Sequence, residues 1–246
     1  MKNGEKQSQG STVRNLLEGA DGNTAEIRRT LEILFEPVAV VELRAFKGRE
    51  TVSGYFDDYE LLACEASKLE DRGYSVCVTL NEVDPALLAR ASNRARRVYK
   101  EPTTSNNDIV RRRWLPLDFD PVRPSGVSAT DAEKKAARRR TLEVREFLRG
   151  RGWPEPVVGD SGNGYHLLYR VDLPNDREAL KLVGGVLEAL AFRFSDNAVE
   201  VDVTTCNAAR IWKLYGTTAR KGDDAGDRLH RRSRLLKVPE GAAAWK

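Results

Sequence analysis

Short apolar segments and longer amphipathic segments alternate along the second half of the chain. The strand-like stretches are residues 113–120, 156–160, 165–171 and 199–204. Two longer stretches, 130–149 and 176–194, repeat their apolar positions at helical spacing, and each starts with the residue spacing of a capping box. The predicted order of elements is strand, helix, strand, strand, helix, strand.

The first half of the chain forms a separate pattern. It predicts helices over 24–35 and 58–72 and strands over 38–46 and 74–80. Residues 102–108 have loop composition, and we place a subdomain boundary there. The polar residues 1–23 predict a flexible N-terminal segment. The expected regions are therefore 1–23, an N-terminal α/β subdomain at 24–104, and a second subdomain at 105–246 that ends in a basic segment.

The predicted fold class is α+β. The βαββαβ order of the second subdomain is that of the ferredoxin-like fold, which RNA-recognition modules and polymerase palms share. We therefore expect an N-terminal α/β unit packed on a ferredoxin-like, RRM-like palm. In such a sheet the four strands lie in the order 4-1-3-2.

Composition narrows the setting without defining the function. The 246 residues include 40% hydrophobic and 32% charged residues, enough for a core beneath a strongly ionic surface. Basic residues outnumber acidic ones in 131–151 and 208–237; these stretches are either phosphate-attracting surfaces or solvated helix faces. The three cysteines lack paired spacing, which predicts a reducing cytoplasmic setting. The sequence has no long apolar run and no apolar stretch after the N-terminus, so we expect neither a membrane span nor a signal peptide.

Strand parity brings acidic residues together. Successive side chains on a strand point to opposite faces, so Asp118 and Asp120 share the face opposite Leu115, Leu117 and Phe119. In the last strand Val199, Val201 and Val203 are expected to point inward, and Glu200, Asp202 and Thr204 outward. His166 and Arg170 share one face of the third strand. Because these strands are neighbours in the expected sheet, the three aspartates and His166 should converge.

Converging carboxylates repel one another unless cations neutralise them, and this favours a site for two Mg²⁺ or Mn²⁺ ions held by Asp118, Asp120 and Asp202. Two such ions can activate an attacking hydroxyl and stabilise a leaving pyrophosphate. The alternative for Asp-Phe-Asp-Pro is a strand end that a proline terminates.

A glycine-rich turn precedes His166. Residues 159–166 contain three glycines, so backbone N–H groups could approach phosphate oxygens closely, although a tight hairpin has the same composition. A Walker loop is excluded because no Gly-Lys-Ser/Thr follows. His166, at the end of the turn, favours a contact with a triphosphate.

Basic residues flank the acidic positions. Residues 207–217 predict another strand, on which Arg210 and Lys213 could hold triphosphate or pyrophosphate. Residues three apart on a regular strand face opposite ways, so one of the two should miss the site unless a bulge intervenes. Residues 111–113 are three arginines. They either bind along a template strand or are charged side chains in contact with solvent, and we favour the second alternative for at least two of them.

The motifs resemble those of the archaeo-eukaryotic primase superfamily, and within it the primase-polymerases of phages, plasmids and other mobile elements. The resemblance covers about residues 105–237 and rests on Leu117-Asp118-Phe119-Asp120, Ser161-Gly-Asn-Gly-Tyr-His166 and Val201-Asp202-Val203. One departure is that Ser161 lies five residues before His166, so the compact Ser-x-His form of the family is stretched. Ligands for the zinc module of many relatives are not visible.

The resemblance implies roles for these residues. Asp118, Asp120, Asp202 and His166 would form the catalytic centre; the three aspartates would bind two divalent ions. The residues expected to contact the nucleotide are Ser161, Asn163, His166, Arg210 and Lys213. Single-stranded DNA as template, (d)NTPs and a helicase domain or protein are the expected partners.

Three functions remain open from the sequence. The first is template-directed transfer of nucleotides to a 3′-hydroxyl on single-stranded DNA, with or without a primer. The second is a metal-dependent phosphodiesterase or nuclease that uses the same carboxylates. The third is a non-catalytic module that binds single strands, against which the acidic face counts, because such sheets expose stacking aromatics and only Trp114 is available here.

Overall fold

The computed structural model describes residues 22–241 and shows an α+β protein built on antiparallel sheets. Elements in the first half are α2 (Gly22–Leu34), β1 (Val41–Lys47), β2 (Glu50–Phe56), α3 (Tyr59–Asp71), β3 (Ser75–Thr79), β4 (Glu82–Val83), η1 (Pro85–Arg90), β5 (Arg94–Arg97) and η2 (Asn106–Asp108). Those in the second half are β6 (Ile109–Pro121), α4 (Asp131–Arg149), β7 (Val157–Asp160), β8 (Tyr165–Pro174), α5 (Arg177–Phe194), β9 (Val199–Val201), η3 (Val203–Cys206), β10 (Ile211–Lys213), β11 (Thr218–Ala219), β12 (Arg231–Arg232) and β13 (Arg234–Lys237).

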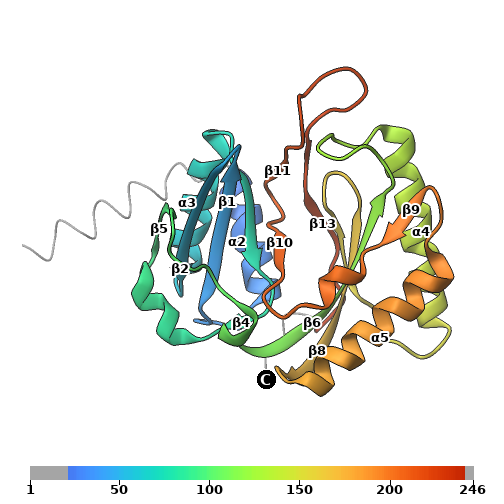
Figure 1. Cartoon of the computed structure of the whole chain (residues 1–246), viewed down its shortest axis with the longest axis horizontal. Helices are drawn as coiled ribbons and strands as arrows, with labels where there is room; N and C mark the ends of the chain where they lie inside the picture. The colour runs from blue at the N-terminus through green and yellow to red at the C-terminus, as the bar shows by residue number, and fades with distance from the viewer. Residues whose placement is uncertain (1–21, 242–246) are drawn as a thin grey trace, which may run out of the picture.

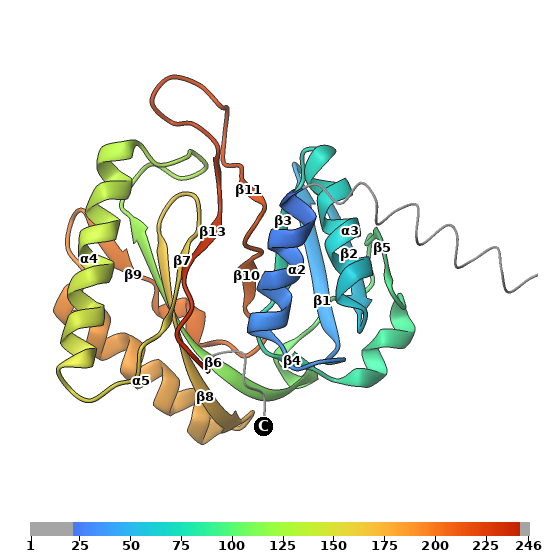
Figure 2. The same ribbon diagram turned by 180° about the vertical axis from the view of Figure 1, so that it is seen from behind.

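The first sheet has five strands in the order β10-β3-β1-β2-β5. Helices α2 and α3 cover one of its faces, which is the near side in Figure 2. Alternation along β1 places Val41, Leu43 and Ala45 on this covered face, where each is fully buried. Asp58 caps α3 by accepting hydrogen bonds from the backbone N–H groups of Glu60 and Leu61.

The second sheet runs β13-β7-β8-β6-β4, with β9 paired to the end of β6. The strands β7, β8, β6 and β9 lie next to one another in that order, and each neighbouring pair is antiparallel. Helices α4 and α5 lie on the side of this sheet that faces away from the first sheet (Figure 1). Leu117, Phe119, Val144, Leu167 and Leu187 are fully buried between the sheet and these helices.

Helix α2 also packs against the second sheet. Trp114, Val157 and Leu168 of that sheet belong to the same buried cluster as α2 and the first sheet, and Trp114 Nε1 donates a hydrogen bond to Leu34 O at 2.8 Å. Helix α2 thus covers this part of the face, while the part that carries Asp118, Asp120 and His166 borders a cavity. Among residues 22–241, no helix is long and apolar enough to cross a membrane.

Several predicted elements need correction. The strand predicted at 199–204 ends at Val201, and a 3₁₀ turn follows, so Val203 is 36% exposed and does not point inward. Of the strand predicted at 207–217, only Ile211–Lys213 is extended, and it joins the first sheet beside β3. The predicted flexible segment 1–23 lies outside the described residues, apart from its last two, which are part of α2.

Candidate functional site

A cavity of about 390 Å³ lies where the edge of the first sheet meets the acidic face of the second. Every site residue predicted from the sequence except Asp202 lines it: Asp118, Asp120, Ser161, Asn163, His166, Arg210 and Lys213. Strand β6 supplies the first two, the β7–β8 hairpin the next three, and the segment around β10 the last two. Segments far apart in the sequence thus meet at one cavity.

The predicted parity of β6 is correct around the acidic residues. Asp118 lies directly opposite His166 on β8, and Asp120 lies opposite Glu200 on β9. Asp202 follows β9, and its backbone N–H donates to Asp118 O at 3.0 Å. Residues directly opposite on paired strands share a face, so these acids gather at one end of one face.

His166 is held in a buried chain of polar groups. Its Nδ1 lies 2.7 Å from the hydroxyl of Tyr215, and this hydroxyl accepts a hydrogen bond from Trp212 Nε1 at 3.1 Å. Burial raises the pKa of Tyr215, so the phenol keeps its proton and can donate it to Nδ1. With Nδ1 directed at the Tyr215 hydroxyl, the other ring nitrogen, Nε2, faces Asp118.

Asp118 has an unsatisfied oxygen. Its Oδ1 is buried, lies 3.4 Å from His166 Nε2 and has no hydrogen-bond partner among the described residues. Burial raises the pKa of Asp118, but His166, Arg210 and Lys221 outweigh it and hold the pKa below its ordinary value. Asp118 is therefore an ionised carboxylate with an unused acceptor.

The other two aspartates are paired with cations. Asp120 Oδ1 lies 3.0 Å from Arg123 Nη1. Asp202 Oδ2 lies 2.7 Å from Arg210 Nη2, while its Oδ1 accepts hydrogen bonds from the N–H and hydroxyl of Thr204. Within residues 22–241, no three His, Cys, Asp or Glu side chains are arranged as a ligand set for a metal ion. Basic side chains, rather than a shared ligand geometry, neutralise these carboxylates.

The donor set nevertheless suits Mg²⁺ or Mn²⁺. Carboxylate oxygens are the ligands that these ions prefer, and the three aspartates share one end of one sheet face. The unpartnered Oδ1 of Asp118 is a ready acceptor for a cation. To bind the ions, Asp120 would have to release Arg123, and Asp202 would have to release Arg210.

The glycine-rich turn is a tight hairpin held by its own side chains. Ser161 Oγ accepts from the N–H of Gly164 at 2.8 Å, and Asp160 Oδ1 accepts from the N–H of Gly162 at 2.7 Å. Buried Asn163 accepts from the N–H of Ala129 at 2.8 Å. The N–H groups of Gly162 and Gly164 are thus engaged within the turn, as the hairpin alternative predicts, and Ser161 and Asn163 shape the wall of the cavity.

Four basic residues line the cavity: Arg210, Lys213, Arg220 and Lys221. Both predicted cations reach it because Arg210 lies before β10, outside the strand, so the alternation rule does not apply between it and Lys213. Lys213 Nζ donates to Thr218 O at 2.8 Å, and burial lowers its pKa from 10.5 to about 8. Arg220 and Lys221 were missed as site residues, although they lie in the basic stretch 208–237 that the sequence singled out.

The three consecutive arginines of β6 do not face the cavity. Arg111 pairs with Asp172, and Arg113 pairs with Glu36 and Glu82 at 2.8 and 3.0 Å. Arg112 is buried and donates to Cys206 O at 2.7 Å. The expectation of solvated charge is wrong for this run: the guanidinium groups join β6 to neighbouring segments.

No protein-family model matches the chain, and a search of the curated proteins finds no match. Among solved structures, the chain is similar to the crystal structure of primase RepB′, with a TM-score of 0.47 and 10% identity over 90% of this chain and 60% of that one. It is also similar to the catalytic domain of primase RepB′ in complex with initiator DNA, with a TM-score of 0.44 and 11% identity over 91% of each chain. The chain spans less than two thirds of the first of these, and both similarities concern the fold alone.

Proposed function

We propose that this protein is a primase-polymerase, which transfers nucleotides from (d)NTPs to a 3′-hydroxyl on a single-stranded DNA template. The observation that carries the proposal is the composition of the cavity, in which the acidic end of β6 faces four basic side chains. Nucleotidyl transfer needs both features: acidic ligands near the reacting α-phosphate, and positive charge around the triphosphate and the leaving pyrophosphate. The order and pairing of β7, β8, β6 and β9 are consistent with a ferredoxin-like palm.

The basic residues of the cavity are assigned to the triphosphate. Arg220 and Lys221 follow β11, while Arg210 and Lys213 flank and end β10, so the phosphates are approached from two segments. Arginine and lysine bind phosphate oxygens through charge-assisted hydrogen bonds. A nuclease that cuts a phosphodiester has no pyrophosphate to hold, and the four cations therefore favour transfer over strand cleavage.

Asp118, Asp120 and Asp202 are assigned to the divalent ions. Two Mg²⁺ or Mn²⁺ ions supply Lewis-acid activation of the attacking hydroxyl and charge stabilisation of the pyrophosphate. Arg210 would then leave Asp202 for the triphosphate, which links nucleotide binding to the freeing of a metal ligand.

His166 is assigned a supporting role at Asp118. The Tyr215 hydroxyl fixes the ring so that Nε2 points to the Asp118 carboxylate. The ring helps to keep Asp118 ionised and limits how far its side chain can turn. A non-catalytic module that binds bases by stacking is disfavoured, because Trp114 is buried against α2.

The test is nucleotide incorporation on single-stranded DNA with Mg²⁺ or Mn²⁺, with and without an annealed primer. We expect Asp118→Asn to reduce incorporation by roughly 100-fold or more, because the change removes charge from the reacting centre. Asp71→Asn, at the exposed end of α3, is the matched control and should leave the rate unchanged.

Two outcomes would overturn the proposal. Shortening of the DNA strand by the wild type would assign the site to a nuclease. DNA binding without nucleotide incorporation in the presence of either metal would show that the protein is a non-catalytic binding module.

A further inference from the structure

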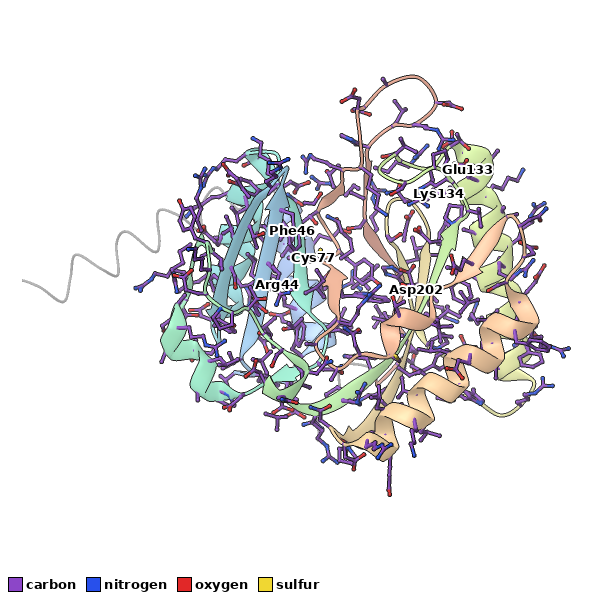
Figure 3. All side chains as sticks on the ribbon, viewed as in Figure 1. Arg44, Phe46, Cys77, Glu133, Lys134 and Asp202 are labelled. Atoms are coloured by element: carbon purple, nitrogen blue, oxygen red, sulfur yellow. The ribbon has the colours of Figure 1, made fainter. Side chains whose placement is uncertain are left out.

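The first sheet has one face that the helices leave uncovered. On β1, Glu42, Arg44 and Phe46 alternate with the buried residues that face α2 and α3, so they project from the opposite side. Figure 3, which views the molecule from that side, labels Arg44, Phe46 and Cys77 on this sheet. This face is continuous with the candidate site, because Cys77 of β3 also lines the 390 Å³ cavity.

The strand register defines a row of side chains across this face. Lys213 lies opposite Cys77, Cys77 opposite Arg44, Arg44 opposite Ser53, and Ser53 opposite Arg96. Basic residues therefore occupy every second strand of the row: β10, β1 and β5. With about 4.8 Å between neighbouring strands, the row is about 19 Å long.

The two ends of the row open into different cavities. Lys213 lines the candidate active site. At the other end a second cavity of about 230 Å³ is lined by the exposed Arg90 and Arg96 and by Glu101, which pairs with Arg96 at 2.8 Å. The row thus leads from the cavity assigned to the triphosphate to a basic recess at the edge of the sheet.

In the middle of the row, the basic side chain is paired with a buried carboxylate. Arg44 donates to the fully buried carboxylate of Glu42, which also accepts from the hydroxyl of Ser53 at 2.6 Å. The backbone N–H of Thr104 approaches the same carboxylate at 3.3 Å, so residues near Thr104 cover this part of the face. Beside the row, Phe46 is only half-buried, and its strand partners are Ser75 and Thr51. The half-exposed ring of Phe46 thus lies between two small polar residues.

We propose that the unpaired template strand crosses this face from β10 to β5 beside the covered middle of the row, past Ser75, Phe46 and Thr51. One base stacks on Phe46, and Arg90 and Arg96 hold the phosphates, with Arg96 exchanging Glu101 for a phosphate. The inference rests on the proposed function and adds the route of the template. A length of about 19 Å accommodates roughly five nucleotides at the stacked spacing of about 3.4 Å. An aromatic platform beside basic side chains is how proteins hold single strands without reading their sequence.

A single strand fits this face better than a duplex. Stacking on Phe46 requires an unpaired base, because the faces of paired bases are covered within the helix.

The test measures the affinity of the full chain for fluorescent oligothymidine, as a function of salt and without nucleotide. We expect Arg90→Gln with Arg96→Gln to weaken binding about tenfold and to reduce the slope of log Kd against log salt by about 0.7 for each lost phosphate contact. Phe46→Ala should weaken binding roughly fivefold or more and leave the salt slope unchanged. The Michaelis constant for the nucleotide should stay unchanged in all of these variants.

The matched control is Lys135→Gln with Arg139→Gln, two exposed cations on α4 at the far side of the second sheet, for which we expect wild-type binding. Thermal unfolding of each variant checks that it is folded. Wild-type affinity in both the arginine and the phenylalanine variants would overturn the template route, even if the wild type incorporates nucleotides. Conversely, loss of binding in a protein that makes no product would leave the route in place and refute the proposed polymerase function.

Discussion

His166 gains its orientation from a residue 49 positions away along the chain. The Tyr215 hydroxyl serves two buried partners, since it accepts from Trp212 Nε1 and lies 2.7 Å from His166 Nδ1. Gly159 makes room for this arrangement, because a Cβ atom there would lie 2.3 Å from the Tyr215 oxygen. The geometry around Asp118 therefore depends on residues that carry no charge.

Removing that hydroxyl should destabilise the protein. Tyr215→Phe leaves Trp212 Nε1 and His166 Nδ1 without their partner in a buried site, and we expect a loss of about 1–3 kcal/mol in the free energy of unfolding, measured in urea. Tyr169→Phe is the control, because the buried Tyr169 hydroxyl has no hydrogen-bond partner within residues 22–241 and its removal should cost nothing. Equal losses in both variants would contradict the role of Tyr215.

The lowered pKa of Lys213 should give nucleotide binding a pH dependence. Burial brings this pKa to about 8, so the ammonium group is charged at pH 7 and loses its proton as the pH rises above about 8. We expect the affinity for a nucleoside triphosphate to fall between pH 7 and 9 in the wild type and to change less in Lys213→Met. An equal decline in both proteins, measured by titration calorimetry, would show that Lys213 does not contact the phosphates.

The same shift has a definite sign for stability. The unfolded chain keeps the ordinary value of 10.5, so between about pH 8 and 10.5 it binds more protons at this residue than the folded chain does. The contribution of Lys213 to the free energy of unfolding therefore rises with pH in that window and is least favourable below it.

Single residues of the site were predictable where a local rule applied. Asp118 and Asp120 follow from alternation on β6. His166 follows from the face of its strand and the expected strand order, and the structure places it opposite Asp118. Tyr215, Arg220 and Lys221 could not be placed by alternation, because they reach the site through turns and a change of sheet. Their positions depend on long-range packing, which leaves no local pattern.

At the scale of elements, the β7–β8 hairpin fixes the edge of the cavity. Gly164 allows this hairpin to approach the end of β6, since a Cβ atom there would lie 2.2 Å from the backbone oxygen of Phe119. The obstacle is backbone and cannot turn aside as a side chain could. The hairpin and the acidic strand are therefore in fixed register.

Gly164→Ala should disturb that contact. We expect a loss of about 1–3 kcal/mol in stability from the overlap, together with reduced incorporation, because Asp120 Oδ1 lies 3.2 Å from the same Cβ position. The control is Gly184→Ala in the middle of α5, where the new methyl group meets no heavy atom within 4 Å and the helix should gain up to about 1 kcal/mol. Thermal unfolding distinguishes the two, and a stable, active Gly164→Ala protein would contradict the close approach.

Predictability also varied among the elements. Helices α4 and α5 were predicted closely because each has a long amphipathic period. The predicted capping box, Thr130 with Glu133, is correct for α4, whereas Asp176 caps α5 in place of the predicted Asn175. Strand β2 was missed between two predicted elements, and β6 begins at Ile109, four residues before its predicted start. Short strands such as β9 and β10 end where turns begin, and their length is decided by neighbours rather than by their own sequence.

At the scale of the whole molecule, the two halves of the chain are interleaved. Strand β10, from the second half, forms an edge of the first sheet, while β4, from the first half, pairs with β6. The buried cluster around α2 includes Trp212, Leu214 and Tyr215 as well as residues of the first sheet. The candidate site lies at this junction, so its geometry depends on both halves.

This interleaving predicts that the first half does not fold by itself. A fragment of residues 24–104 lacks β10 and the aromatic residues that complete its core, including Trp114, Trp212 and Tyr215, which are each at most 3% exposed in the full chain. Loss of large buried side chains costs several kcal/mol each, comparable to the whole stability of a small domain. We expect the fragment to show no cooperative thermal transition by circular dichroism, and co-expression with residues 105–246 to restore one. A sigmoidal transition in the isolated fragment would instead show that the sequence boundary at 102–108 separates two independent folding units and that the site forms by their docking.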